Sequence, residues 1–160
     1  MIFKPTDKRR IIDCVADTGI DVSPWHQTEG DPSTNPKFCY EWTYSDPKRF
    51  IFVFNVWAEE IEEVDGVTRT CKNSRKTAEA VTPAQSKRYH RARRSDRNLE
   101  LAYSLDAAVR MIVIDGDRNA DKQRVLLRDL DPVAWFVQSY DPMTGSGVVV
   151  RGPRPIQLAA

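Results

Sequence analysis

The sequence contains no apolar run long enough to cross a bilayer and no apolar stretch near its start of the kind found in signal peptides. A membrane-spanning helix needs roughly 18 or more consecutive, mainly apolar residues. A signal peptide needs a shorter apolar core behind a basic start, whereas the chain is mostly polar from Lys4 to Arg10. We therefore expect a soluble, cytoplasmic protein that has no membrane partner.

Cysteine and histidine are both scarce. Cys14, Cys39 and Cys71 are odd in number, lie far apart and include no Cys-x-x-Cys pair. This spacing indicates free thiols, and neither a disulfide framework nor a zinc knuckle. His26 and His90 have no cysteine or histidine at the spacing of metal ligands. We expect no zinc and no other cofactor.

The short motifs of common enzymes are also missing. The chain has no Gly-x-Gly-x-x-Gly run, no phosphate-binding Gly-Lys-Ser/Thr loop and no Gly-x-Ser-x-Gly elbow. Asp31 followed by Asp46-Pro47-Lys48 has the spacing of metal ligands in restriction nucleases, but that chemistry needs a strand where Pro47 favours a turn. Without a complete catalytic constellation, a binding protein is favoured over an enzyme.

Asp115 and Asp117 are the best-placed carboxylates for an enzymatic alternative. They follow a short β-branched run, Met111 to Ile114, that predicts a strand. Two oxygen ligands at the end of a strand can bind a divalent cation, although a charged turn is the favoured explanation for them. A small metal-dependent nuclease or hydrolase therefore stays open as an alternative.

The composition is that of an ordinary globular protein. Of 160 residues, 41% are hydrophobic and 29% charged, and two domains of half this length would each be near the lower limit for burying a core. We expect a single domain over residues 1–152. The prolines after Gly152 predict a flexible tail over residues 153–160.

Local patterns predict an α+β fold with a mixed or mainly antiparallel sheet of about five to six strands and two or three helices. A first helix is expected from a cap at Thr6 to a stop at Gly19, and a long one from Thr82-Pro83 to about Val109. Alternating aromatics from Phe38 to Tyr44 predict a strand. The other expected strands cover residues 50–57, 67–71, 111–114, 125–127, 135–138 and 148–150.

A basic segment in the long predicted helix is the clearest functional signal. The net charge is only +1, but cations gather in residues 87–97, and Asp96 is the single acid between Gln85 and Asn98. Arginines one turn apart on an exposed helix face can neutralise successive phosphates. A solvated face and an acidic protein partner are the alternatives. The candidate nucleic-acid-binding residues are Lys87, Arg88, Arg91, Arg94 and Arg97.

Aromatic residues form a second candidate set. Rings that sandwich a base, with polar groups at its edge, are typical of pockets that read an unstacked nucleotide. Each ring is equally compatible with the core, except Trp25, which lies in a proline-rich loop of the kind that carries recognition residues. The candidate pocket residues are Trp25, His26, Tyr40, Trp42, Asn55 and Trp57.

Several short strings together resemble the N-terminal region of bacterial HNH-type restriction endonucleases. The resemblance spans roughly residues 8–152. The strings are Asp21-Val22-Ser23-Pro24-Trp25, Asn35-Pro36-Lys37-Phe38-Cys39-Tyr40-Glu41-Trp42, Asn55-Val56-Trp57, Val113-Ile114-Asp115-Gly116, Leu130-Asp131-Pro132-Val133-Ala134-Trp135 and Tyr140-Asp141.

The resemblance implies a target-recognition role in restriction or defence. In such proteins the N-terminal region is expected to bind the DNA target, with modified bases as one possible target, while a separate HNH domain cleaves. The present sequence has neither the paired histidines nor the cysteine framework of an HNH domain. The nuclease would then be a separate domain or subunit. A protein-interaction or inhibitor module is a further alternative, and the oligomeric state stays open.

Overall fold

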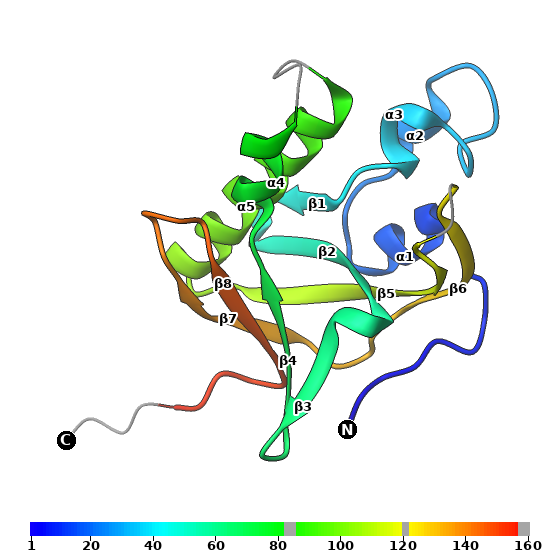
Figure 1. Cartoon of the computed structure of the whole chain (residues 1–160). Helices are drawn as coiled ribbons and strands as arrows, with labels where there is room; N and C mark the ends of the chain where they lie inside the picture. The colour runs from blue at the N-terminus through cyan, green and yellow to red at the C-terminus, as the bar shows by residue number, and fades with distance from the viewer. Residues whose placement is uncertain (82–85, 120–121, 157–160) are drawn as a thin grey trace.

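Eight strands form one mixed sheet in the computed structural model, which describes residues 1–81, 86–119 and 122–156 (Figure 1). The strand order is β1-β2-β5-β7-β8-β4-β3, with β6 beside β5. Only β2 and β5 run parallel, and every other pair is antiparallel. The strands are β1 (Thr43–Asp46), β2 (Ile51–Trp57), β3 (Ile61–Val64), β4 (Val67–Lys72), β5 (Ala108–Asp117), β6 (Arg124–Leu130), β7 (Trp135–Tyr140) and β8 (Gly147–Arg151).

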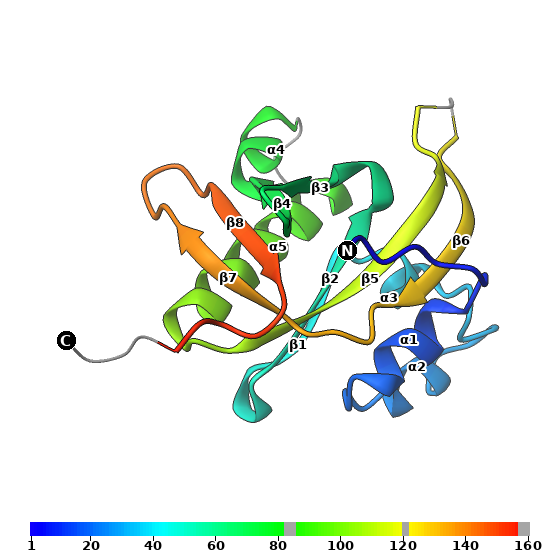
Figure 2. The same ribbon diagram turned by 90° about the horizontal axis from the view of Figure 1, so that it is seen from below.

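Helices cover both faces of the sheet (Figures 1 and 2). The described residues include α1 (Ile11–Asp17), α2 (Ser23–His26), α3 (Pro36–Cys39), α4 (Ser74–Ala80) and α5 (Lys87–Ser104), with 3-10 turns η1 (Pro47–Arg49) and η2 (Ala58–Glu60). The predicted α+β class is confirmed. The predicted numbers of strands and helices were both too low. The helices were missed because α2 and α3 are single turns and α4 lacks an apolar repeat.

Strand β2 separates two hydrophobic cores. Side chains alternate between the faces of a strand. Phe52, Phe54 and Val56 belong to the core that includes Leu99 and Ala102 of α5. Val53 belongs to the opposite core, which also contains residues of α1, Trp25 of α2 and Ile112 of β5. The strand predicted over residues 50–57 is confirmed as Ile51–Trp57, which is buried on both faces and pairs antiparallel with β1.

The sheet divides at the start of β5. Strand β7 pairs with β5 only at Ala108 and Val109, whereas β6 pairs with β5 from Ile112 onward. Figure 2 shows β7 and β8 leaving β5 in a different direction from β6. The β7-β8-β4-β3 branch curves back, so that Lys72 Nζ of β4 donates a hydrogen bond of 3.1 Å to Asn55 O of β2. Two strands that are not neighbours in the sheet therefore meet.

The aromatic alternation over residues 38–44 wrongly predicted one strand. Asn35 caps α3 by accepting a hydrogen bond of 2.9 Å from Lys37 N, and Pro36 occupies the first turn of the helix. Proline fits the first helical position because it needs no backbone donor there. The single turn takes Phe38 out of the alternation, and strand β1 starts only at Thr43.

The long helix is shorter than predicted. Helix α5 begins after Ser86, whose Oγ accepts a hydrogen bond of 3.1 Å from Tyr89 N, and the predicted start at Thr82-Pro83 lies outside the described residues. The helix ends at Ser104, because Asp106 adopts a left-handed conformation with φ of 53° that reverses the chain. Val109, predicted in the helix, lies in β5.

Two further expectations concern the ends of the chain. Helix α1 starts at Ile11 and not at Thr6. The described part of the predicted tail has no regular structure, but Arg154 pairs with Asp106 at 2.6 Å and donates to Val137 O at 2.8 Å. Residues 157–160 lie outside the description. No helix among the described residues is long and apolar enough to span a membrane.

Candidate nucleic-acid interface

The acid of the basic segment points into the protein. Asp96 is 6% exposed and accepts hydrogen bonds from Arg75 Nε at 3.0 Å and Tyr140 Oη at 2.7 Å. Burial and the Asp96 carboxylate raise the pKa of Tyr140 to about 12. Next to Asp96, Ser95 Oγ accepts from Ser74 Oγ at 2.8 Å. Helix α5 is thus fixed to α4 and β7 through its polar inner face, and its cations are left outside.

Three of the predicted arginines lie against the segment that joins α3 to β1. The Arg91 guanidinium lies 5.7 Å above the Tyr40 ring, and Arg94 Nη1 pairs with Glu41 at 2.7 Å. The Arg88 guanidinium lies 5.5 Å above the Trp42 ring. Three arginines of α5, spaced three residues apart, therefore contact three consecutive residues, Tyr40 to Trp42.

The remaining cations of α5 are free. Lys87, Arg93 and Arg97 are exposed, and within the described chain they make no ion pair. Arg93 and Arg97 lie in an open groove of about 630 Å³ that runs along α5, which we call the basic groove. The basic groove is lined by Arg75, His90, Arg93, Arg94, Asp96, Arg97 and Glu100. Five of these seven side chains are basic in type, and Asp96 is already paired with Arg75.

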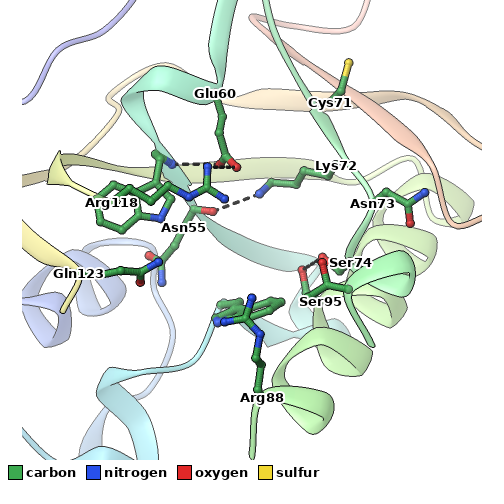
Figure 3. Close-up of a pocket in the computed structure, with 13 residues that line it drawn as sticks. Asn55, Glu60, Cys71, Lys72, Asn73, Ser74, Arg88, Ser95, Arg118 and Gln123 are labelled. Atoms are coloured by element: carbon green, nitrogen blue, oxygen red, sulfur yellow. Dashed lines mark hydrogen bonds and ion pairs between the residues drawn. The ribbon is translucent and has the colours of Figure 1, made fainter. Parts of the chain in front are cut away.

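A smaller pocket lies on the other side of α5, where β2 and β4 meet (Figure 3). Its volume is about 240 Å³. We call it the β2–β4 pocket. Three predicted residues, Trp42, Asn55 and Trp57, line it together. Arg88, which was predicted to bind nucleic acid, also lines it. The sequence did not indicate the remaining lining residues, which are Glu60, Cys71, Lys72, Asn73, Ser74, Thr77, Ser95, Arg118 and Gln123.

Lys72 is the central charge of the β2–β4 pocket. Burial lowers its pKa, the Glu60 carboxylate partly opposes that shift, and Arg118 adds to it. The ammonium donates to Asn55 O and lies 5.8 Å from the centre of the Phe54 ring. No carboxylate in the described chain forms an ion pair with it. An ammonium in this setting attracts an anionic or electron-rich ligand.

Polar groups around Lys72 hold the pocket in shape. Glu60 accepts hydrogen bonds from Arg118 Nη1 at 2.7 Å and from Trp57 N at 3.3 Å. Asn55 Nδ2 donates to Glu41 O at 2.8 Å, which orients the amide. Asn55 Oδ1 is buried and accepts no hydrogen bond from any described residue. Figure 3 shows Lys72 reaching from β4 toward Asn55, with Arg118 and Gln123 on one side and Ser74 and Ser95 on the other.

The other three predicted pocket residues lie elsewhere. Trp25 is 4% exposed and stacks on Phe38 with centroids 5.2 Å apart and planes 10° apart, so it belongs to the core and not to the pocket. The proline-rich sequence around Trp25 suggested an exposed loop, but α2 packs on α3 and buries the ring. His26 is exposed at the end of α2. Tyr40 is 57% exposed and lies under Arg91, outside the pocket.

The two carboxylates considered for metal binding lie within β5 and not beyond it. Asp115 and Asp117 are exposed on either side of Gly116, where the pairing with β6 shifts register. Asp117 Oδ1 accepts a hydrogen bond of 3.2 Å from Asn119 N. Across residues 1–81, 86–119 and 122–156, no three histidine, cysteine or acidic side chains form a group that could hold a metal ion.

Comparison with protein-family models, with curated proteins and with solved structures finds no match to the chain. The assignment of a function therefore depends on the basic groove and the β2–β4 pocket.

Proposed function

We propose that this chain is a DNA-binding module of the restriction or defence type, which contacts the phosphate backbone through the exposed face of α5. The observation that carries the proposal is that Lys87, Arg93 and Arg97 stand exposed and without ion pairs in the described chain, while Asp96 of the same helix is turned inward. A solvated helix face normally carries acids that pair with its cations. Among the described residues of α5 no cation pairs with an acid of the same helix, and of these cations only Arg94 forms an ion pair, with Glu41 outside the helix.

The spacing along α5 suits a polyanion. Lys87 and Arg91, and likewise Arg93 and Arg97, are four residues and so about one turn apart, and one turn rises about 5.4 Å along the axis. Cations at this interval can neutralise successive phosphates and release their counterions. Arginine also binds a phosphate with two parallel hydrogen bonds, which gives each contact a defined geometry.

The resemblance to the recognition region of HNH-type restriction endonucleases supports the biological context. On that basis the module locates the DNA target, and a nuclease domain or subunit acts as its partner. The strings that carry the resemblance include Trp42, Asn55 and Trp57, the three predicted residues of the β2–β4 pocket. A modified base is one target that such a pocket can distinguish, so methylated duplex belongs in the test.

The experiment is a titration of fluorescent duplex DNA, unmodified and methylated, at several salt concentrations. Four phosphate contacts, from Lys87, Arg91, Arg93 and Arg97, predict a slope of about −3.6 for the logarithm of the binding constant against the logarithm of the salt concentration. The Arg93→Ala/Arg97→Ala double variant should reduce the slope to about −1.8, because each contact contributes about −0.9.

The matched control is Lys4→Ala/Lys8→Ala, which removes the same charge from exposed positions outside α5. We expect it to bind DNA nearly as the unmodified chain does. If neither duplex binds at low salt, or if both double variants weaken binding equally, α5 is not a DNA-binding face. A difference between the two duplexes would assign base reading to the module.

A further inference from the structure

We infer that the β2–β4 pocket binds one nucleotide unstacked from a DNA strand, with its base against the pocket tryptophans and its phosphate on Lys72 and Arg88. This inference rests on the proposed DNA-binding function and specifies which part of the strand enters the protein. The size of the pocket, its two indole rings, its charge and its unused polar atoms support it.

The size limits the ligand to a single small ring system. Pockets for drug-sized ligands range from about 300 to 1,000 Å³, and the β2–β4 pocket, with about 240 Å³, is below that range. Two stacked bases do not fit such a volume. One base with its sugar phosphate at the mouth is the largest part of a nucleic acid that it can take.

The two indole rings are placed for stacking. Trp25 and Trp135 are 4% and 1% exposed and belong to the cores, whereas Trp42 and Trp57 are only partly buried and line the pocket. Bases stack on tryptophan faces with little regard to sequence. The Arg88 guanidinium above Trp42 adds a flat cation to the same wall. Part of the tryptophan surface is thus held open where a base can reach it.

The pocket carries more positive than negative charge. Lys72, Arg88 and Arg118 line it, and Glu60, its single carboxylate among the described lining residues, is already bonded to Arg118. Lys72 and Arg88 are left to balance an anion. A phosphate bound to Lys72 would also offset the cost of its burial, which lowers its pKa.

Unused hydrogen-bonding groups can read the edge of a base. Within the described chain Lys72 donates one hydrogen bond, to Asn55 O, although an ammonium has three donors. Asn55 Oδ1 lacks a donor within the described residues. A buried acceptor without a partner is costly, and such groups occur where a ligand supplies the missing hydrogen bond. Two donors of Lys72 are therefore left, one for the phosphate and one for the base, and Asn55 Oδ1 is left as an acceptor for the same base.

Helix α5 connects the pocket to the basic groove. Arg88 and Ser95 line the pocket, and His90, Arg93, Arg94 and Arg97 line the groove. Arg88 precedes Arg93 by five residues, which corresponds to about 7.5 Å along the helix axis. A strand held in the groove can therefore place a neighbouring nucleotide at the pocket.

The test follows the indole N–H resonances of the four tryptophans by NMR during titration with deoxynucleoside monophosphates, deoxynucleosides and inorganic phosphate. We expect the monophosphates to shift the resonances of Trp42 and Trp57 and to leave those of Trp25 and Trp135 in place. A deoxynucleoside or inorganic phosphate alone should bind at least about tenfold more weakly than a monophosphate, since each supplies only part of the contact.

Two variants test the pocket and leave Trp42 and Trp57 in place, since replacing a partly buried tryptophan could disturb the fold. Lys72→Met and Arg88→Met should each weaken monophosphate binding about tenfold, and Arg88 is exposed, so its replacement leaves folding intact. Arg93→Ala/Arg97→Ala is the matched control, because it removes basic groups from the groove and should leave monophosphate binding unchanged. If both methionine variants bind monophosphates like the unmodified chain, or if no monophosphate shifts Trp42 or Trp57, the pocket assignment is wrong.

A single-stranded oligonucleotide identifies the source of the nucleotide. We expect it to bind more tightly than a monophosphate and to lose that gain in Arg93→Ala/Arg97→Ala. Equal affinity for the oligonucleotide and the monophosphate would assign a free nucleotide to the pocket. It would overturn the inference that the nucleotide belongs to a DNA strand. Duplex binding without monophosphate binding would refute the pocket alone, and monophosphate binding without duplex binding would refute the proposed DNA-binding face.

Discussion

Replacement of Asp131 by alanine should destabilise the protein more than replacement of any exposed acid. Asp131 is fully buried at the end of β6. Its Oδ2 accepts from Trp135 Nε1 at 2.9 Å and from Arg151 Nε at 2.7 Å, and its Oδ1 accepts from Arg151 Nη2 and Val133 N, both at 2.9 Å. A carboxylate offers about four acceptor sites, and all four are used.

The expected cost follows from what the substitution leaves behind. The Arg151 side chain is only 18% exposed and would lose its counterion, while the buried Trp135 indole would lose its acceptor. Breaking a buried ion pair by removing one partner costs about 3–5 kcal/mol. With a urea dependence of about 2 kcal/mol per molar, the unfolding midpoint should fall by about 2 M.

The assay is urea unfolding followed by circular dichroism, with Glu62→Ala as the control. Glu62 forms an exposed pair with Arg69 at 2.8 Å, and such pairs contribute about 0–1 kcal/mol. Asp131→Ala/Arg151→Leu should recover part of the loss, because the uncompensated charge is gone. If Asp131→Ala shifts the midpoint no more than Glu62→Ala, the four-bond cluster does not hold β6, β7 and β8 together.

Two further predictions concern Lys72 and the thiols. Lys72→Met should change the free energy of unfolding by less than about 1 kcal/mol at neutral pH, because the lost hydrogen bond is offset by the removal of a buried charge. Burial lowers the pKa of Lys72 below its ordinary value, so the unfolded chain binds more protons between the two pKa values. The free energy of unfolding of the unmodified chain relative to that of Lys72→Met should therefore rise with pH in that window. Urea unfolding at several pH values measures this difference, and a difference that does not change with pH would contradict the prediction. For the thiols, alkylation followed by mass spectrometry should modify exposed Cys71 first and Cys14 only on unfolding, because burial raises the pKa of Cys14 to about 11. Early modification of Cys14 in the native protein would show that its core opens readily.

Sequence patterns located those strands whose signal is local. The apolar run at residues 51–57 predicted β2, since a strand covered on both faces needs no polar side. The Asp65-Gly66 turn between β3 and β4 is a local signal too, because both residues adopt the left-handed conformations, φ 51° and 79°, that a tight turn requires. In both cases the residues that carry the signal also form the structure.

The short helices and the β2–β4 pocket could not be predicted in the same way. A four-residue helix such as α3 has no period to detect, and its start depends on a cap at Asn35. The sequence indicated Trp42, Asn55 and Trp57, but Lys72 lies beside them only because the branch of the sheet that contains β4 curves back. Curvature arises from how β6 and β7 share one edge of β5, and no local pattern encodes that.

The parallel pairing of β2 with β5 determines when the centre of the sheet can form. Residues 58–107 lie between these strands, so their six aligned residue pairs require closure of a long loop. The entropy of closure must be overcome before the contacts become favourable, which slows folding. Until then β2 can pair only with β1 and β5 only with the strands that follow it, so each of these apolar strands has one edge that is open to association with other chains. The strand pair that organises the native molecule is thus also its most vulnerable element during synthesis.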